Sequence, residues 1–155
     1  MEEEKEALDQ CKDELKRVDH LIYVSLKYTR TCDVFKNIIT RLIDAIDFAL
    51  DALLRKIQEQ GKIMEIPQAA KTKGELVLQH IQEEWVKEMV SLYLQFRQID
   101  KAPFTREREY RRHVTMTCKV EGTEIKVTID NITEYYKRTK MFVEQIEKMV
   151  REGNA

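Results

Sequence analysis

Hydrophobic residues recur every three or four positions along most of this chain, which is the spacing of amphipathic helices. The pattern predicts four long helices, at about residues 3–29, 31–60, 72–100 and 131–151. The second carries the widest apolar stripe and is the expected centre of the core, with Gly61 as its C-cap. Its stripe consists of Phe35, Ile38, Ile39, Leu42, Ile46, Ala49, Leu50, Leu53 and Ile57.

The spacing changes to every second residue between about residues 113 and 130, which predicts one β-hairpin inserted before the last helix. Glu121 and Gly122 are the expected two-residue turn, because glycine takes a positive φ at little cost. The last helix is expected to begin at Asp130 or Asn131, whose side chains are good N-caps. In this register the strand residues pair as Lys119 with Glu124, Cys118 with Ile125, Thr117 with Lys126, Met116 with Val127, Thr115 with Thr128, Val114 with Ile129 and His113 with Asp130.

Together these elements predict a mainly α fold, a four-helix bundle of long helices with one β-hairpin, in a single domain over residues 1–155. Composition agrees, since 43% of the residues are hydrophobic, 35% are charged, and only four are Gly and two Pro, unlike a disordered or collagen-like chain. No apolar run is long enough to span a bilayer, and the start M-E-E-E-K-E is acidic, where a signal peptide is basic and then apolar. We therefore expect a cytoplasmic protein without membrane contact.

Candidate chemistry concentrates in the segment R-E-R-E-Y-R-R-H, which lies at the open end of the predicted hairpin. Its cations and the positive end of the last helix form a candidate site for a phosphate or carboxylate. A competing interpretation is that Glu107 and Glu109, interleaved with the arginines, pair with them on a solvated surface. Because the net charge is −1, any binding of nucleic acid has to rest on such a local patch. The candidate anion-binding residues are Arg106, Arg108, Arg111, Arg112 and His113.

Metal and cofactor sites find little support in the sequence. Asp44, Asp47 and Asp51 share one side of the second predicted helix, a spacing at which carboxylates can converge on a hard cation. Metal sites in helical bundles use Glu-x-x-His pairs on two helices, which this chain lacks. The three cysteines form no C-x-x-C pair and are expected to be buried. We expect no metal and no cofactor.

The stretch from Arg108 to His113 has an arginine, four residues and a histidine, and it resembles the R-x4-6-H motif of the HEPN superfamily. Proteins of that superfamily are helical bundles that commonly dimerise, and many of them cleave RNA with this arginine and histidine. The resemblance implies that Arg108 holds a phosphate and that His113 assists proton transfer at the ribose 2′-hydroxyl. One departure matters, because the motif lies on a helix in that superfamily and His113 is expected to begin a strand.

A second resemblance covers D-H-L-I-Y-V-S-L-K-Y-T-R-T-C-D-V at residues 19–34 and E-Y-R-R-H-V-T-M at residues 109–116. Both runs look like a small family of archaeal proteins defined by a domain of unknown function. The resemblance implies an archaeal source but no activity.

Two hypotheses of function follow. The favoured one is a non-enzymatic helical interaction protein, a homodimer or higher homo-oligomer, whose arginine-rich segment binds RNA or an acidic protein surface. The alternative is a metal-independent ribonuclease of the HEPN kind that uses Arg108 and His113 as catalytic residues. Aromatic side chains can stack on unpaired bases, although tyrosines at helical spacing more commonly belong to a core. The candidates for stacking are Phe104, Tyr110, Tyr135 and Tyr136.

Overall fold

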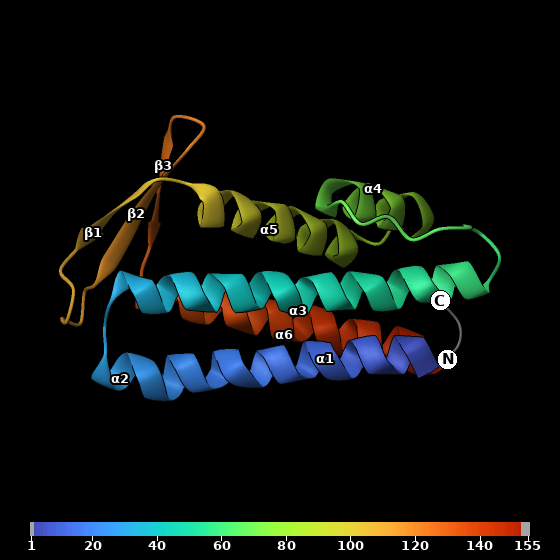
Figure 1. The fold of residues 1–155 in the computed structure, drawn as a ribbon, viewed down its shortest axis with the longest axis horizontal. Helices are drawn as coiled ribbons and strands as arrows, with labels where there is room; N and C mark the ends of the chain where they lie inside the picture. Colours follow the sequence, from blue (N-terminus) through green and yellow to red (C-terminus); the bar gives the residue numbers. More distant parts are fainter. Residues whose placement is uncertain (1, 153–155) are drawn as a thin grey trace.

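The computed structural model describes residues 2–152, which form five helices and a three-stranded antiparallel sheet placed before the last helix (Figure 1). The first helix is one continuous rod made of α1 (Glu2–His20), a π-helical turn η1 (Leu21–Ser25) and α2 (Leu26–Tyr28). The remaining elements are α3 (Cys32–Glu59), α4 (Ala70–His80), α5 (Glu84–Lys101), β1 (Phe104–Glu107), β2 (Thr115–Val120), β3 (Thr123–Val127) and α6 (Ile129–Glu152). The prediction of a mainly α fold with strands before the last helix is confirmed, but the predicted four helices are five and the predicted hairpin is part of a three-stranded sheet.

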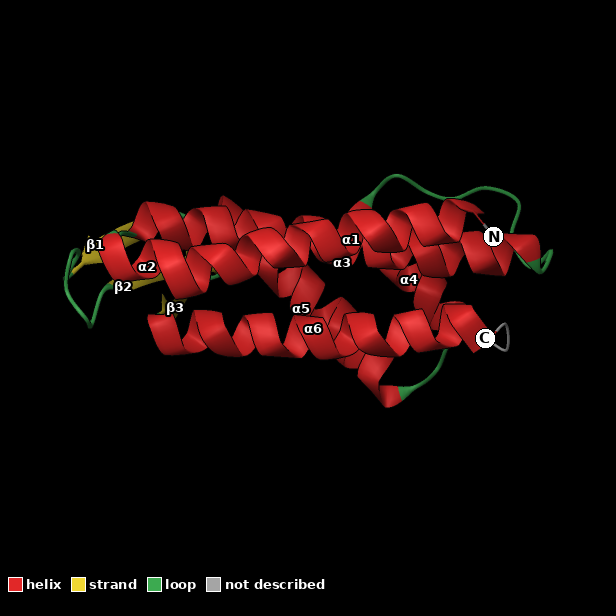
Figure 2. Ribbon diagram, turned by 90° about the horizontal axis from the view of Figure 1, so that it is seen from below, coloured by secondary structure: helices red, strands yellow, loops and turns green. Residues whose placement is uncertain are grey.

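Helix α3 is the centre of the structure and packs against α1, α4, α5 and α6 (Figures 1 and 2). All nine residues of its predicted stripe are buried, so the predicted core helix is confirmed. Gly61 follows the helix with φ 75°, and its N–H donates to the Gln58 carbonyl while Lys62 N–H donates to the Ile57 carbonyl. This is the Schellman arrangement, in which glycine is favoured because it has no Cβ.

The π-helical turn in the first helix changes which residues face the core. A π turn contains more residues than an α turn, so each residue after it is rotated about the helix axis less than in a continuous α-helix. Val18 and Ile22 continue the buried seam as expected, but Leu26 is buried at its end and Ser25 is only half-buried. The predicted helix at residues 3–29 is confirmed with this one-residue shift.

The single helix predicted over residues 72–100 is wrong, because the chain leaves the helical conformation at residues 81–83 and forms α4 and α5 instead. The break lets α4 contact both α3 and α5. Lys73 reaches Asp47 and Asp51 on α3, and a Cβ added to Gly74 would lie 2.8 Å from Val90 Cγ1 on α5. These tertiary contacts override the helical pattern at residues 81–83, where the sequence has no Gly or Pro.

The predicted register of the hairpin is confirmed from Lys119–Glu124 to Met116–Val127. Glu121 and Gly122 both have positive φ, 51° and 80°, as a type I′ turn requires. The predicted pairs beyond Met116–Val127 are wrong, since the ladder ends there and the chain enters α6 at Ile129. These pairs are Thr115–Thr128, Val114–Ile129 and His113–Asp130.

Strand β1 was not predicted from the sequence. It pairs antiparallel with β2, from Phe104–Cys118 to Glu107–Thr115, and gives the sheet the order β1-β2-β3. After the half-buried Phe104 its residues are exposed, so the strand lacks the alternation of apolar and polar side chains that marks a half-buried strand.

Candidate functional site

The candidate site lies at one end of the bundle, where three connections come together: residues 29–31 before α3, residues 108–114 between β1 and β2, and residues 128–130 at the start of α6. Figures 1 and 2 place these segments at the end opposite to the labels of the N- and C-termini. The sheet thus holds the arginine-rich segment beside the first turns of α3 and α6.

The connection between β1 and β2 is fixed to the start of α3 by three contacts. Tyr110 N–H donates to the Arg30 carbonyl (2.6 Å). Cys32 N–H donates to Glu109 Oε2 (2.9 Å), so this carboxylate binds the positive end of α3. Arg106 Nη2 lies 2.9 Å from Asp33 Oδ1. These contacts give the arginine-rich loop a defined position without any regular secondary structure of its own.

Two residues of this loop have a backbone conformation that side chains disfavour. Arg108 has φ 54° and Tyr110 has φ 66°, both in the left-handed region. For a residue other than glycine such a conformation costs about 1–3 kcal/mol and persists only where the surroundings impose it. The three contacts to α3 are those surroundings.

A groove of about 770 Å³ opens between the three connections. It contains three of the five predicted anion-binding residues, Arg108, Arg112 and His113, and adds Arg30, which the sequence analysis missed. The predicted Arg106 and Arg111 are not among its lining residues. We call it the arginine groove; its lining consists of Arg30, Arg108, Arg112, His113, Thr115, Thr128, Ile129 and Asp130.

Arg106 is already neutralised within the protein. Its guanidinium contacts both Asp33 and Glu109 and lies 5.1 Å from the centre of the Phe104 ring. The hydrogen bond to Asp33 raises the pKa of Arg106 above its usual value. For Arg106 the competing interpretation is therefore correct: this arginine pairs with acidic residues of the protein itself.

The arginines that line the groove differ from Arg106, because the acidic residues next to them in sequence are engaged elsewhere. Glu109 binds Cys32 N and Arg106, and Glu107 accepts a hydrogen bond from Thr117 Oγ1. Within residues 2–152, Arg108, Arg112 and Arg30 form no ion pair. Asp130 is the one carboxylate that lines the groove, so the groove keeps a positive excess.

The start of α6 forms one wall of the groove, and its N-cap is Thr128 where Asp130 or Asn131 was predicted. Asn131 N–H donates to Thr128 Oγ1 (3.2 Å), and Thr128 N–H donates in return to Asn131 Oδ1 (3.2 Å). This reciprocal pair has the form of a capping box. The helix therefore begins inside the groove, and Asp130 lies in its first turn.

Two of the three aspartates of the candidate cation site on α3, Asp47 and Asp51, bind a lysine. Lys73 Nζ lies 3.0 Å from Asp47 Oδ1 and 2.8 Å from Asp51 Oδ1, and Tyr93 Oη donates to the same Asp47 oxygen. Burial disfavours the charged ammonium, but its hydrogen bonds to Asp51 and Asp47 outweigh that effect and raise the pKa of Lys73. In the described part of the chain no group of three His, Cys, Asp or Glu residues is arranged to hold a metal ion.

The cysteines are buried and unpaired, as expected from their apolar positions. Burial raises the pKa of Cys11 to about 12 and that of Cys32 to about 11. A protonated, buried thiol is a poor nucleophile, so these cysteines contribute to the core.

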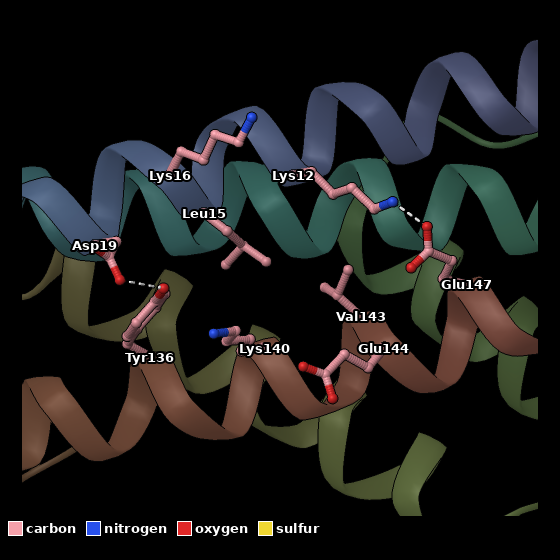
Figure 3. A pocket seen from close by; sticks show the side chains of 9 residues that line it. All are labelled: Lys12, Leu15, Lys16, Asp19, Tyr136, Lys140, Val143, Glu144 and Glu147. Atoms are coloured by element: carbon pink, nitrogen blue, oxygen red, sulfur yellow. Dashed lines mark hydrogen bonds and ion pairs between the residues drawn. The ribbon is translucent and has the colours of Figure 1, made fainter.

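A second groove runs between α1 and α6, over the apolar side chains of Leu15 and Val143 (Figure 3). Two contacts cross this groove: Lys12 pairs with Glu147, and Tyr136 Oη donates to Asp19 Oδ2 (2.9 Å). Three lysines and three carboxylates line it, so it has no excess of one charge comparable to that of the arginine groove.

Comparison with known proteins gives no match: no family model, no curated protein and no solved structure is similar to this chain. Among residues 2–152, no helix has the length and apolar character needed to cross a bilayer.

The Glu109 contact predicts a measurable effect on stability. Glu109→Ala removes the acceptor at the start of α3 together with one partner of Arg106, and we expect the free energy of unfolding to fall by about 1–2 kcal/mol. Urea denaturation followed by circular dichroism measures this change. Glu109→Gln keeps an acceptor for Cys32 N and should lose less; equal losses in the two variants would contradict the capping role.

Proposed function

We propose that this chain is a non-enzymatic binding protein whose arginine groove holds an anionic partner, either RNA or an acidic surface of another protein. One observation carries the proposal: Arg30, Arg108 and Arg112 line one hollow and form no ion pair in the described structure. Arg30 Nε also donates to the Leu26 carbonyl (3.2 Å). Guanidinium groups without a carboxylate partner are well suited to phosphate or carboxylate, because each offers several N–H donors in a planar fork.

The backbone of the groove supports the same function. Its arginine loop is tied to α3 through Arg30 and Cys32, so a bound anion does not have to order a mobile segment first. Pre-organised donors bind more tightly for that reason. The positive end of α6 adds to the local potential.

Replacing both loop arginines tests this function. Arg108→Ala combined with Arg112→Ala should weaken the binding of RNA at low salt and should reduce the slope of log affinity against log salt by about 2, since each phosphate contact contributes about one unit. Filter binding over a range of salt concentrations measures both quantities.

A matched control is Arg151→Ala, which removes an arginine from the last turn of α6, far along the helix from the groove. This variant should bind RNA like the unmodified protein. RNA binding that is the same in the double variant and in the unmodified protein, together with unchanged binding of an acidic peptide, would refute the proposal.

A ribonuclease of the HEPN kind is the second candidate, and it is favoured by one observation: Arg108 and His113 line the same groove. One phosphate between them would place a cation on its oxygens and an imidazole beside the neighbouring ribose. The departure is that residues 108–114 form a loop, whereas the resembling motif lies on a helix. The shared groove therefore supports the binding of one ligand by Arg108 and His113 more directly than it supports the catalytic arrangement of the HEPN superfamily.

Cleavage is distinguished from binding by one variant. If the protein is a ribonuclease, labelled single-stranded RNA is cleaved in the presence of a metal chelator, and His113→Ala abolishes cleavage while RNA is still bound. Gel electrophoresis of the RNA gives the result. Intact RNA after incubation with the unmodified protein would exclude this candidate and leave the binding protein.

We further propose that the chain forms a homodimer. The outer edge of β3 has no strand beside it within the described chain, and an exposed strand edge can pair with a second copy. Light scattering of the pure protein should give twice the 18.5 kDa mass of one chain. A mass of 18.5 kDa at high concentration would contradict a dimer.

A further inference from the structure

We propose that the partner of the arginine groove is a single-stranded nucleic acid whose unpaired bases stack on the rings of Tyr28 and Tyr110. This inference rests on the proposed function, because the groove arginines would hold the phosphates of the same strand. It goes further in naming the class of partner and the two side chains that select it.

Both rings are exposed to a degree that folding does not explain. Tyr28 is 84% exposed and Tyr110 is 75% exposed. Neither side chain makes a hydrogen bond or a ring contact within the described residues. An aromatic ring gains free energy when it leaves water, and in the free protein these two rings have not left it.

Neither ring is among the residues that line the groove, but both tyrosines lie close in sequence to its arginines. Tyr28 is two residues before Arg30, and Tyr110 lies between Arg108 and Arg112. The hydrogen bond from Tyr110 N–H to the Arg30 carbonyl joins the two segments. Each ring therefore belongs to the same short segment as an arginine of the groove.

The backbone at Tyr110 is a separate indication. Its φ of 66° is a conformation in which glycine is favoured, and its exposed side chain offers no packing in return. The bond from its N–H to the Arg30 carbonyl holds this backbone conformation, but the ring gains nothing within the fold, and such a side chain is expected at a functional site. Base stacking would supply the missing role for the ring.

The other aromatic candidates from the sequence are engaged in the fold. Tyr136 is buried and binds Asp19, and Tyr135 packs edge-on against Phe96 at 5.0 Å. The Phe104 ring lies under the cations of Lys36 and Arg106. Tyr110 is thus the one predicted stacking residue that stays exposed, and Tyr28 joins it.

Exposed rings beside arginines favour a single strand over the other anions. Unpaired bases offer their faces to an aromatic ring, and stacking tolerates any base. A duplex keeps its base faces stacked on one another, and an acidic protein surface has no comparable flat groups. The predicted preference is therefore for single-stranded RNA or DNA over the same sequence in a duplex.

The test measures binding of a fluorescently labelled oligouridine by anisotropy, with the duplex it forms with oligoadenine as the comparison. Tyr28→Ala and Tyr110→Ala should each weaken single-strand binding about 5- to 100-fold and leave the salt dependence unchanged, because no phosphate contact is lost. Tyr28→Phe and Tyr110→Phe keep the ring and should bind like the unmodified protein. Tyr110→Gly relieves the backbone and keeps the N–H bonded to Arg30, so it should fold at least as stably and still lose binding.

The two levels of the proposal fail in different ways. If Arg108→Ala weakens binding and the alanine variants of the tyrosines do not, or if the duplex binds as well as the single strand, the stacking inference is overturned and the anion-binding function stands. If neither arginine nor tyrosine variants change binding of RNA, and the arginine variants also leave binding of an acidic peptide unchanged, both are overturned.

Discussion

The carboxylate of Glu109 joins two parts of the chain that are 77 residues apart, by accepting the N–H of Cys32 at the start of α3. With the bond between Tyr110 and Arg30, it determines where the connection between β1 and β2 lies. The Glu109 carboxylate also binds Arg106, and within residues 2–152 it forms no ion pair with Arg108 or Arg112. The same contact thus orders the loop and leaves its arginines unneutralised.

The bundle provides the rigid base for this end of the molecule. Helix α3 is covered by four other helices, and its first turn holds the loop through Cys32 and Asp33. Strand β2 packs against α3 and α5, with Met116 and Cys118 buried. The groove is therefore made of irregular backbone that is held by the end of α2, the starts of α3 and α6, and the sheet.

Periodicity was enough to predict the parts of the fold that depend on local sequence. The stripe of α3 from Phe35 to Ile57 and the pairing of Cys118 with Ile125 both follow from the spacing of apolar residues. The break at residues 81–83 and strand β1 were missed, because they depend on contacts with α3 and β2 that no local pattern reports. Arg30 was missed for the same reason: it enters the groove only through the docking of a loop distant in sequence.

The π-helical turn at Leu21–Ser25 determines the direction, around the helix axis, in which the side chains after it point. Each residue of an α-helix advances the helix by about 100°, so the extra residue of a π turn determines the azimuth at which α2 ends. Tyr28 is the last residue of α2, and Arg30 follows two residues later. Deleting one residue from this turn would leave the helix and its buried residues up to Val18 unchanged. Tyr28 and Arg30 would then be rotated about the helix axis and would face a different side of the molecule.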